Sequence, residues 1–379
     1  MDDKEVMYLE NELKTSIYKV NDQFKDMSTE ERRSELLAIQ RMRREFGNGC
    51  DDRNSKTSHT QNRRRKHFYQ YMISEWFLKA PEDLNEQWVV KLIPNGIRLL
   101  LIAKKGHTSA FYKCGQPCIY LKTKFPGGDS RKGAMTVLDC VYNKDTQTFY
   151  IVDCLSWNNI VLLNEDAAFR FYWLRNRLLD SPELLEMSGY SFRHVDYLDV
   201  NLEAIQEELD RPSEINNGQV ISYGGAVFYH KESLYTFGYT PLSLWLPTFM
   251  FQEMLGIHVK PEHLQNMPEN YQNVEVYIKG IIDKVKRRTK ISESVEMECE
   301  ENNGMEDVQE EVSPPYVKYN RKRNIESLDL PEDSVVHLES KKRKIITEIH
   351  FNSLKRMQEQ TDIFDELIPK KKKLEFFYE

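Results

Sequence analysis

Runs of β-branched and aromatic residues between positions 68 and 288 constrain this chain most. Such runs, bounded by polar turn residues, are typical of strands. They predict strands at 88–93, 97–103, 135–142 and 149–153, with a shorter one at 225–229. Strands broken by only a few helices favour an α+β fold class, here one mostly antiparallel sheet domain over 68–288.

Two local signals refine that prediction. Asn95-Gly96 lies between the first two predicted strands, and this dipeptide is a strong hairpin signal, so we expect those strands to pair. The segment 165–178 predicts a helix that packs Phe169, Tyr172 and Trp173 against the sheet.

The N-terminal region, residues 1–67, is polar and predicts a helix over about 28–46. Ser28 and Glu31 have the spacing of a capping box. Leu36, Ile39, Met42 and Phe46 then recur at helical spacing. The other positions carry a basic set, which reads either as an ordinary solvated face or as a binding surface: Arg32, Arg33, Arg41, Arg43 and Arg44.

The last region, residues 289–379, changes composition sharply. Between 291 and 312 there are nine acidic residues and no Lys or Arg. Basic islands follow at 321–323, 341–344 and 370–373. Charge blocks with few apolar residues cannot offset the entropy of ordering, so we expect a disordered tail. The islands fit nuclear localisation signals or plain solvated tails, and both interpretations stay open.

Charge and cysteine usage exclude several classes of protein. The net charge of −7 argues against non-specific coating of nucleic acid, which needs a dominant positive field. The six cysteines lack the paired spacing of a zinc site, so we predict free thiols and no metal. We find neither an apolar signal segment nor a membrane-spanning run, and expect a soluble intracellular protein.

The middle region resembles the nucleotidyltransferase domain of messenger-RNA capping enzymes and ATP-dependent ligases. In that superfamily a KxDGxR motif carries the lysine nucleophile, and the matching stretch here runs from Ile93 to Arg98. Isoleucine has no amine to form a phosphoramidate. The stretches 139–141, 224–228 and 244–247 match three later motifs of the superfamily but lack their ionic groups. The resemblance therefore implies a pseudo-enzyme that binds a nucleotide-like ligand.

A narrower resemblance covers about 68–260. The segments ISEW (73–76), QWVV (87–90), FPGG (125–128), FRFYW (169–173), FYHK (228–231) and TPLSLWL (240–246) occur in the same order as in snurportins. Snurportins bind the 2,2,7-trimethylguanosine cap of spliceosomal small nuclear RNAs. The resemblance implies no cofactor and a cap-binding set on these positions: Ile73, Ser74, Trp76, Arg98, Lys113 and Trp245.

Those residue types suit such a ligand. A 7-methylated guanine is cationic, so the indole of Trp245 attracts it beyond ordinary stacking. An apolar wall at Ile73 and Trp76 accepts the two N2 methyl groups and leaves the donors of a monomethylated cap unpaired. Arg98 and Lys113 counter the triphosphate charge. Trp245, between Leu244 and Leu246, fits a core position equally well; as a stacking residue, its removal is expected to abolish cap binding and leave the fold intact.

The same resemblance implies import receptors as partners. The helix over 28–46 matches the importin-β-binding segment that snurportins place before the cap domain, with Leu36 and the five arginines as the contact set. The leader residues Val6, Leu9, Leu13 and Ile17 suggest a further contact, with an exportin for recycling. An import adaptor of this kind shuttles between nucleus and cytoplasm.

Two other functions remain open at the level of sequence. One is an active RNA guanylyltransferase or ligase, which requires an attacking lysine, and Ile93 argues against it. The other is a non-catalytic scaffold with a vestigial pocket. A labelled covalent adduct identifies the first, and a titration with a cap analogue separates the second from an import adaptor.

Overall fold

The computed structural model describes residues 1–46, 71–129, 133–186, 189–211, 214–215 and 219–299. The chain divides into two compact units, Met1–Lys318 and Tyr319–Glu379, and the second lies wholly outside the described residues. The predicted disordered tail beyond residue 299 and its basic islands also lie outside them.

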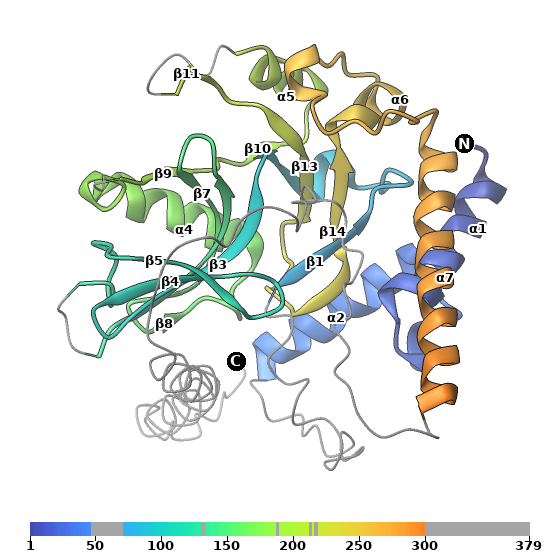
Figure 1. Ribbon diagram of the computed structural model, residues 1–379, viewed down its shortest axis with the longest axis horizontal. Coiled ribbons are helices and arrows are strands. Elements are labelled where there is room, and N and C mark those ends of the chain that lie inside the picture. Colours follow the sequence, from blue (N-terminus) through green and yellow to red (C-terminus); the bar gives the residue numbers. More distant parts are fainter. Residues whose placement is uncertain (47–70, 130–132, 187–188, 212–213, 216–218, 300–379) are drawn as a thin grey trace, which may run out of the picture. The chain divides into compact units, whose positions relative to one another are not determined.

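Two sheets form the centre of the described unit (Figure 1). Sheet A has the strand order β1-β14-β13-β2-β10, in which only β1 and β14 run parallel. Its strands are β1 (Met72–Trp76), β14 (Gly238–Pro247), β13 (Tyr223–His230), β2 (Trp88–Pro94) and β10 (Leu198–Asp199).

Sheet B has the order β5-β4-β3-β6-β7-β8, and β9 adds to β7 in parallel. All its other pairs are antiparallel, which confirms the α+β, mostly antiparallel prediction. Its strands are β3 (Ile97–Lys104), β4 (His107–Phe111), β5 (Pro117–Leu121), β6 (Met135–Asn143), β7 (Thr148–Trp157), β8 (Ile160–Val161) and β9 (Ser191–His194). A minor pair joins β11 (Glu214–Ile215) to β12 (Gln219–Val220).

The hairpin predicted at Asn95-Gly96 is wrong, although both flanking strands exist. β2 belongs to sheet A and β3 to sheet B, so this turn carries the chain from one sheet to the other. A Cβ on Gly96 would lie 2.5 Å from the main-chain oxygen of Tyr142 on β6. The glycine is therefore required by the close approach of β6, and not by a two-residue hairpin.

The helix predicted at 165–178 is α4 (Ala167–Leu179), capped by Asp166, but it buries a different face. Phe169 is 42% and Tyr172 60% exposed, so the prediction is wrong for these two residues. Trp173 does pack partly against the core of sheet B. Helical spacing from the capped start places a different stripe inward, and it is buried: Ala167, Arg170, Phe171, Leu174 and Leu178.

The N-terminal region packs on the sheet domain. It forms α1 (Asp3–Leu13), a π-helical turn (Lys14–Tyr18), a 3-10 turn (Asp22–Phe24) and α2 (Thr29–Phe46). α1 lies alongside α7 (Val274–Cys299), and an ion pair of 2.6 Å joins Glu5 to Lys279 (Figure 1). The backbone of α7 stays helical through residue 299, so the predicted tail boundary at 289 falls inside this helix.

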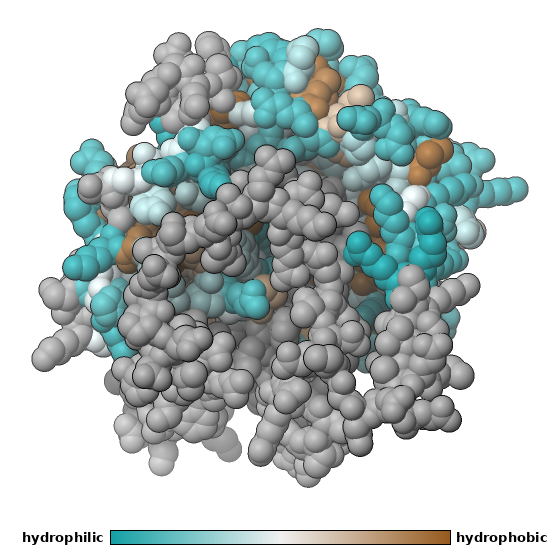
Figure 2. Space-filling view, in the orientation of Figure 1, coloured by the Kyte–Doolittle hydropathy of each residue, from teal (hydrophilic) through white to brown (hydrophobic). Residues whose placement is uncertain are grey.

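The remaining described helices are short. They are α3 (Leu84–Gln87), α5 (Leu202–Asp210) and α6 (Phe251–Leu255), with 3-10 turns at Pro182–Leu184, Thr248–Met250 and Pro261–His263. On the face drawn in Figure 2, the coloured surface is mostly hydrophilic with small separate apolar patches. Among the described helices, none has the length and apolar character needed to cross a bilayer.

Candidate functional site

Four of the predicted site residues lie on two adjacent strands of sheet A. β1 carries Ile73, Ser74 and Trp76, and β14 carries Trp245. Trp76 and Trp245 are register partners, and the hydroxyl oxygens of Ser74 and Ser243 are 2.7 Å apart. The sequence-based grouping of these residues therefore corresponds to one continuous patch of sheet A.

All four side chains are buried in this conformation. Ile73 is 6%, Ser74 7%, Trp76 6% and Trp245 2% exposed. The Trp245 indole extends across the neighbouring strand to Gly225, where a Cβ would lie 2.5 Å from its Cη2 atom. A guanine can stack on this indole only after a neighbouring group moves away from it.

Ile93, predicted from the sequence to replace a lysine nucleophile, lies on the strand next to Gly225, over which that indole extends. It is 1% exposed and pairs with Gly225 across β2 and β13. An apolar side chain beside the tryptophan offers no amine and no ionic group at this point.

Arg98 lies on sheet B, at the start of β3, and is held by a buried carboxylate. Its Nε donates to Asp139 at 2.9 Å, and Nη2 donates to the second oxygen of the same carboxylate. Tyr235 also donates to Asp139, at 2.9 Å. Burial and the Asp139 charge raise the pKa of Tyr235 well above its usual value. Arg98 is thus paired with Asp139, which the sequence analysis identified only as part of an altered motif.

Aromatic rings connect the two predicted phosphate-facing residues to the start of β1. The Arg98 guanidinium lies 5.1 Å from the ring centroid of Tyr71, which directly precedes β1. Lys113 is half-buried, and its Nζ lies 5.9 Å from the ring centroid of Tyr239. Tyr239 is the register partner of Ile73. The structure therefore brings Arg98 and Lys113 toward the same end of β1.

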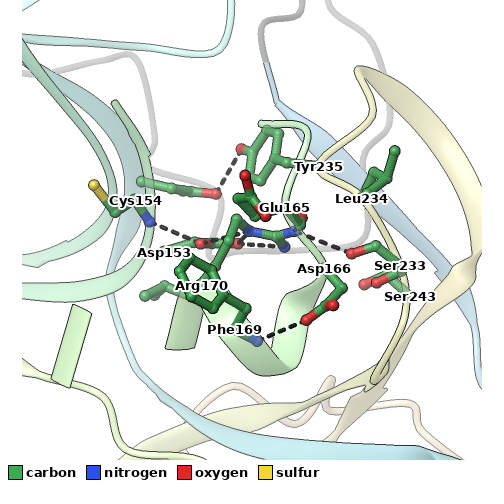
Figure 3. Close-up of polar contacts among 12 residues, drawn as sticks. Asp153, Cys154, Glu165, Asp166, Phe169, Arg170, Ser233, Leu234, Tyr235 and Ser243 are labelled. Atoms are coloured by element: carbon green, nitrogen blue, oxygen red, sulfur yellow. Dashed lines mark hydrogen bonds and ion pairs between the residues drawn. The ribbon is translucent and has the colours of Figure 1, made fainter. Parts of the chain in front are cut away.

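A second buried charge cluster, missed from the sequence, lies close by (Figure 3). Arg170 of α4 and Asp153 of β7 form an ion pair of 2.9 Å with both side chains at most 1% exposed. Arg170 also donates to the main-chain oxygens of Glu165 and Ser233. The one available signal was an arginine within the aromatic run 169–173.

Lys91 of β2 adds a third charge-bearing group to this interior. It is fully buried, and its Nζ donates to the main-chain oxygens of Val152 at 2.6 Å and Val195 at 3.1 Å. Burial lowers the pKa of Lys91 to about 7, although the nearby Asp153 opposes that shift. Its hydrogen bonds join sheet A to sheet B, which is a structural role.

The predicted receptor-binding arginines divide into two groups. Arg32 is 3% and Arg33 6% exposed, so these two do not lie on a solvated face. Arg32 pairs with Glu75, and Arg33 donates to the main-chain oxygen of Pro241 at 3.2 Å. The interpretation of this helix face as an ordinary solvated one is therefore wrong at these two positions.

The other members of the set lie further along α2. Arg41, Arg43 and Arg44 are exposed, and Leu36 is half-buried. Arg41 pairs with Glu232 at 2.6 Å, and Arg44 with Asp166 at 3.3 Å. The capping box at the start of the helix is confirmed: Ser28 N–H donates to Glu31 at 2.8 Å, and Glu31 N–H donates to Ser28 Oγ at 3.2 Å.

Metal ligation has no candidate in the described part of the chain. Across those residues, no group of three or more His, Cys, Asp or Glu side chains is arranged to hold an ion. Cys140 and Cys154 are buried free thiols on β6 and β7, and burial raises the pKa of both well above the usual value.

Solved structures similar to this chain include DNA ligases. The ligase domain of M. tuberculosis LigD has 13% identity and a TM-score of 0.34, covering 47% of this chain and 58% of that one. A mycobacterial DNA ligase D complexed with ATP has 13% identity and a TM-score of 0.33, covering 47% and 60%. Chlorella virus DNA ligase-adenylate has 14% identity and a TM-score of 0.32, covering 47% and 66%. The chain spans about 60% of the first two ligases, and at these TM-scores the matches carry no conclusion.

A family model gives a specific match. Residues 70–248 match the model described as Snurportin1, m3G cap-binding domain. The matched span begins just before β1 and ends just after β14, so it contains all six predicted cap-site residues. Residues 70–248, just under half of the chain, form a domain of the snurportin cap-binding family.

Proposed function

We propose that this protein binds the 2,2,7-trimethylguanosine cap of spliceosomal small nuclear RNA and links it to importin-β as a shuttling nuclear import adaptor. The observation that carries the proposal is the family match over residues 70–248. Within that span, Ile73, Ser74, Trp76 and Trp245 form one patch on β1 and β14.

The chemistry of the patch supports a methylated, cationic base as ligand. Indoles attract a 7-methylguanine by stacking and by cation–π interaction, and stacking alone is worth about 1–3 kcal/mol per base. Ile73 and Trp76 supply apolar surface for the N2 methyl groups. Arg98 and Lys113, at the same end of β1, are the groups that face the triphosphate.

Binding without catalysis follows from Ile93. This residue is 1% exposed beside Gly225, where the related enzymes need a lysine amine. Incubation with radiolabelled GTP or ATP should give no covalent adduct.

The direct test is quenching of tryptophan fluorescence by trimethylated and monomethylated cap dinucleotides. The trimethylated ligand should bind more tightly, because the unmethylated N2 amino group of a monomethylated cap leaves its donors unpaired against an apolar wall. A Trp173→Phe variant is the matched control, since Trp173 lies on α4 and contacts Trp157 on sheet B. Equal affinity for the two caps would contradict the proposed specificity for the trimethylated cap.

A non-catalytic scaffold with a closed pocket is the second candidate. The 2% exposure of Trp245 favours it, because no face of the indole is open in this conformation. The same titration separates the two candidates: absence of saturable quenching by either cap supports the scaffold.

The receptor half of the proposal depends on α2. Arg41, Arg43 and Arg44 present positive charge at its exposed end, which suits an acidic receptor surface. A pull-down with importin-β should lose binding when Arg43 and Arg44 are changed to Glu. An exportin remains a further proposed partner; Leu9 and Leu13, which such a contact would use, are fully buried.

A further inference from the structure

β1 is the strand of the cap patch with the least support from its own sheet. It is five residues long and lies at the edge of sheet A, with only β14 beside it. Its register with β14 shifts between Ser74 and Glu75. A short, irregular edge strand depends on contacts from outside the sheet for a fixed geometry.

The N-terminal region supplies those contacts. The main-chain N–H of Trp76 donates to the hydroxyl of Tyr18 at 2.9 Å, which occupies a donor on the outer edge of β1. The Tyr18 ring also lies 5.0 Å from the ring of Tyr239, the partner of Ile73. Residues far before the family-matched span thus complete the strand that carries the patch.

Glu75 is the strongest link between the two regions. It stands between Ser74 and Trp76 on β1, and its side chain is buried against α2. Arg32 of α2 donates to one carboxylate oxygen through Nη1 at 3.0 Å and to the other through Nη2. The two side chains are 3% and 4% exposed, so water solvates neither charge.

Further contacts fix α2 against the sheet domain. The Arg33 guanidinium lies 5.5 Å from the ring centroid of Trp88 and donates to Pro241 of β14. The side-chain oxygen of Gln40 accepts the main-chain N–H of Leu234 at 3.0 Å. A receptor that binds the buried arginines must therefore lift this part of α2 away, and Glu75 is then left without its partner.

We propose that Arg32 and Glu75 are positioning residues of the cap site, so that a receptor which takes Arg32 from Glu75 weakens cap binding. This inference rests on the proposed function. Removing Arg32 leaves the buried Glu75 carboxylate without its counter-charge. β1 must then distort so that water reaches the carboxylate, or the carboxylate must take up a proton. Burial already raises the pKa of Glu75, and the Arg32 charge limits that rise.

Linkage makes the effect reciprocal. If receptor binding weakens the cap complex, the cap must weaken receptor binding by the same factor. Couplings between sites are typically about 5- to 150-fold in affinity. An adaptor built in this way releases its RNA more readily once its receptor is bound.

A double-mutant cycle in the full-length chain tests the pair. Arg32→Leu should weaken binding of the trimethylated cap dinucleotide about tenfold, a typical coupling. Arg32→Leu combined with Glu75→Leu should restore most of the affinity, because an apolar pair leaves no unpaired charge. Arg32→Lys should give an intermediate loss. Arg175→Leu, which removes an exposed arginine of α4 outside both proposed binding sets, is the matched control and should leave cap affinity unchanged.

Thermal unfolding measured beside each titration keeps the cycle interpretable. If Arg32→Leu does not fold, Arg32→Lys and the double variant decide the question, since both keep the buried site free of an unpaired carboxylate. A folded Arg32→Leu with wild-type cap affinity would overturn the proposal. So would a double variant that binds the cap no better than Arg32→Leu alone.

A receptor titration tests the consequence. Saturating importin-β should weaken cap binding by the wild-type chain about tenfold. This weakening of cap binding should be smaller in Glu75→Gln, because its uncharged side chain leaves no unpaired charge when Arg32 moves away. Unchanged cap affinity in a stable ternary complex would refute the coupling and leave the proposed function intact. A wild-type chain that binds no trimethylated cap would instead refute the proposed function itself.

Discussion

Replacing Trp245 with Ala should both unfold the domain more easily and abolish cap binding. The side chain is 2% exposed, and its ring fills the space above Gly225. Truncation of a buried tryptophan to alanine costs about 3–5 kcal/mol, because transfer free energy is lost and a cavity remains. For a domain of this size each kcal/mol lowers Tm by roughly 2–4 °C, so the expected drop is about 6–20 °C. This replaces the expectation from sequence that the fold stays intact.

The assay pairs a thermal scan with a cap titration on wild type, Trp245→Phe and Trp245→Ala. Trp245→Phe keeps an aromatic face and most of the volume, so it should retain measurable cap binding and lose less stability. A Trp245→Ala variant that melts within 1–2 °C of wild type, under about 1 kcal/mol, would refute the burial argument. The indole would then be exposed in solution, as a preformed stacking platform requires.

Three further changes probe the interior. Asp139→Asn should destabilise the fold by about 3–5 kcal/mol in chemical denaturation, because it leaves the guanidinium of Arg98 without its buried partner; a loss below 1 kcal/mol would contradict that pairing. Ile93→Lys should give no labelled nucleotide adduct, since catalytic groups act as a unit and the other motifs are also changed; an adduct would show that the rest of the active site is present. Between pH 7 and 9 the folded state binds fewer protons than the unfolded state at Lys91, so the free energy of unfolding should rise with pH by at most about 1.4 kcal/mol per unit. Lys91→Met should remove this slope in denaturation curves collected across that range, and an unchanged slope would assign it to other groups.

Strand positions were predictable because their cause is local. The runs at 88–93, 97–103, 135–142 and 149–153 all became strands with boundaries shifted by a few residues. β-branched and aromatic residues favour extended backbone wherever they pack, so the pattern alone identifies the element. The capping box at Ser28 and Glu31 was predictable for the same reason, since both its hydrogen bonds lie within four residues.

Pairing was not predictable at Asn95-Gly96, because it depends on long-range contacts. The dipeptide favours a tight turn between β2 and β3. However, β2 pairs with β13 and β3 pairs with β6, which places the two strands in different sheets. The same limit applies to α4. Its aromatic residues suggested an inward face, while the buried ion pair between Arg170 and Asp153 fixes a different one.

The adjacency of the candidate site residues could be predicted from the resemblance, but their burial could not. The resemblance placed Ile73, Ser74, Trp76 and Trp245 together, and the register of β1 with β14 brings them side by side. Nothing in their spacing indicates that all four are buried. Exposure is set by what packs on a strand from elsewhere in the chain, and here the N-terminal region contacts β1 through Tyr18 and Arg32.

The charges around the patch are largely compensated within the protein, and this limits how a capped RNA can bind. Asp139 accepts from two nitrogens of Arg98, so a triphosphate would meet a guanidinium that is already paired with a buried carboxylate. Asp139 and the triphosphate would share Arg98, so each would gain less interaction energy from it than it would alone. Most of the affinity should therefore come from stacking and methyl contacts, and the salt dependence of cap binding should be shallow. The trimethylated base, rather than the phosphate chain, is then the part of the ligand that this site selects.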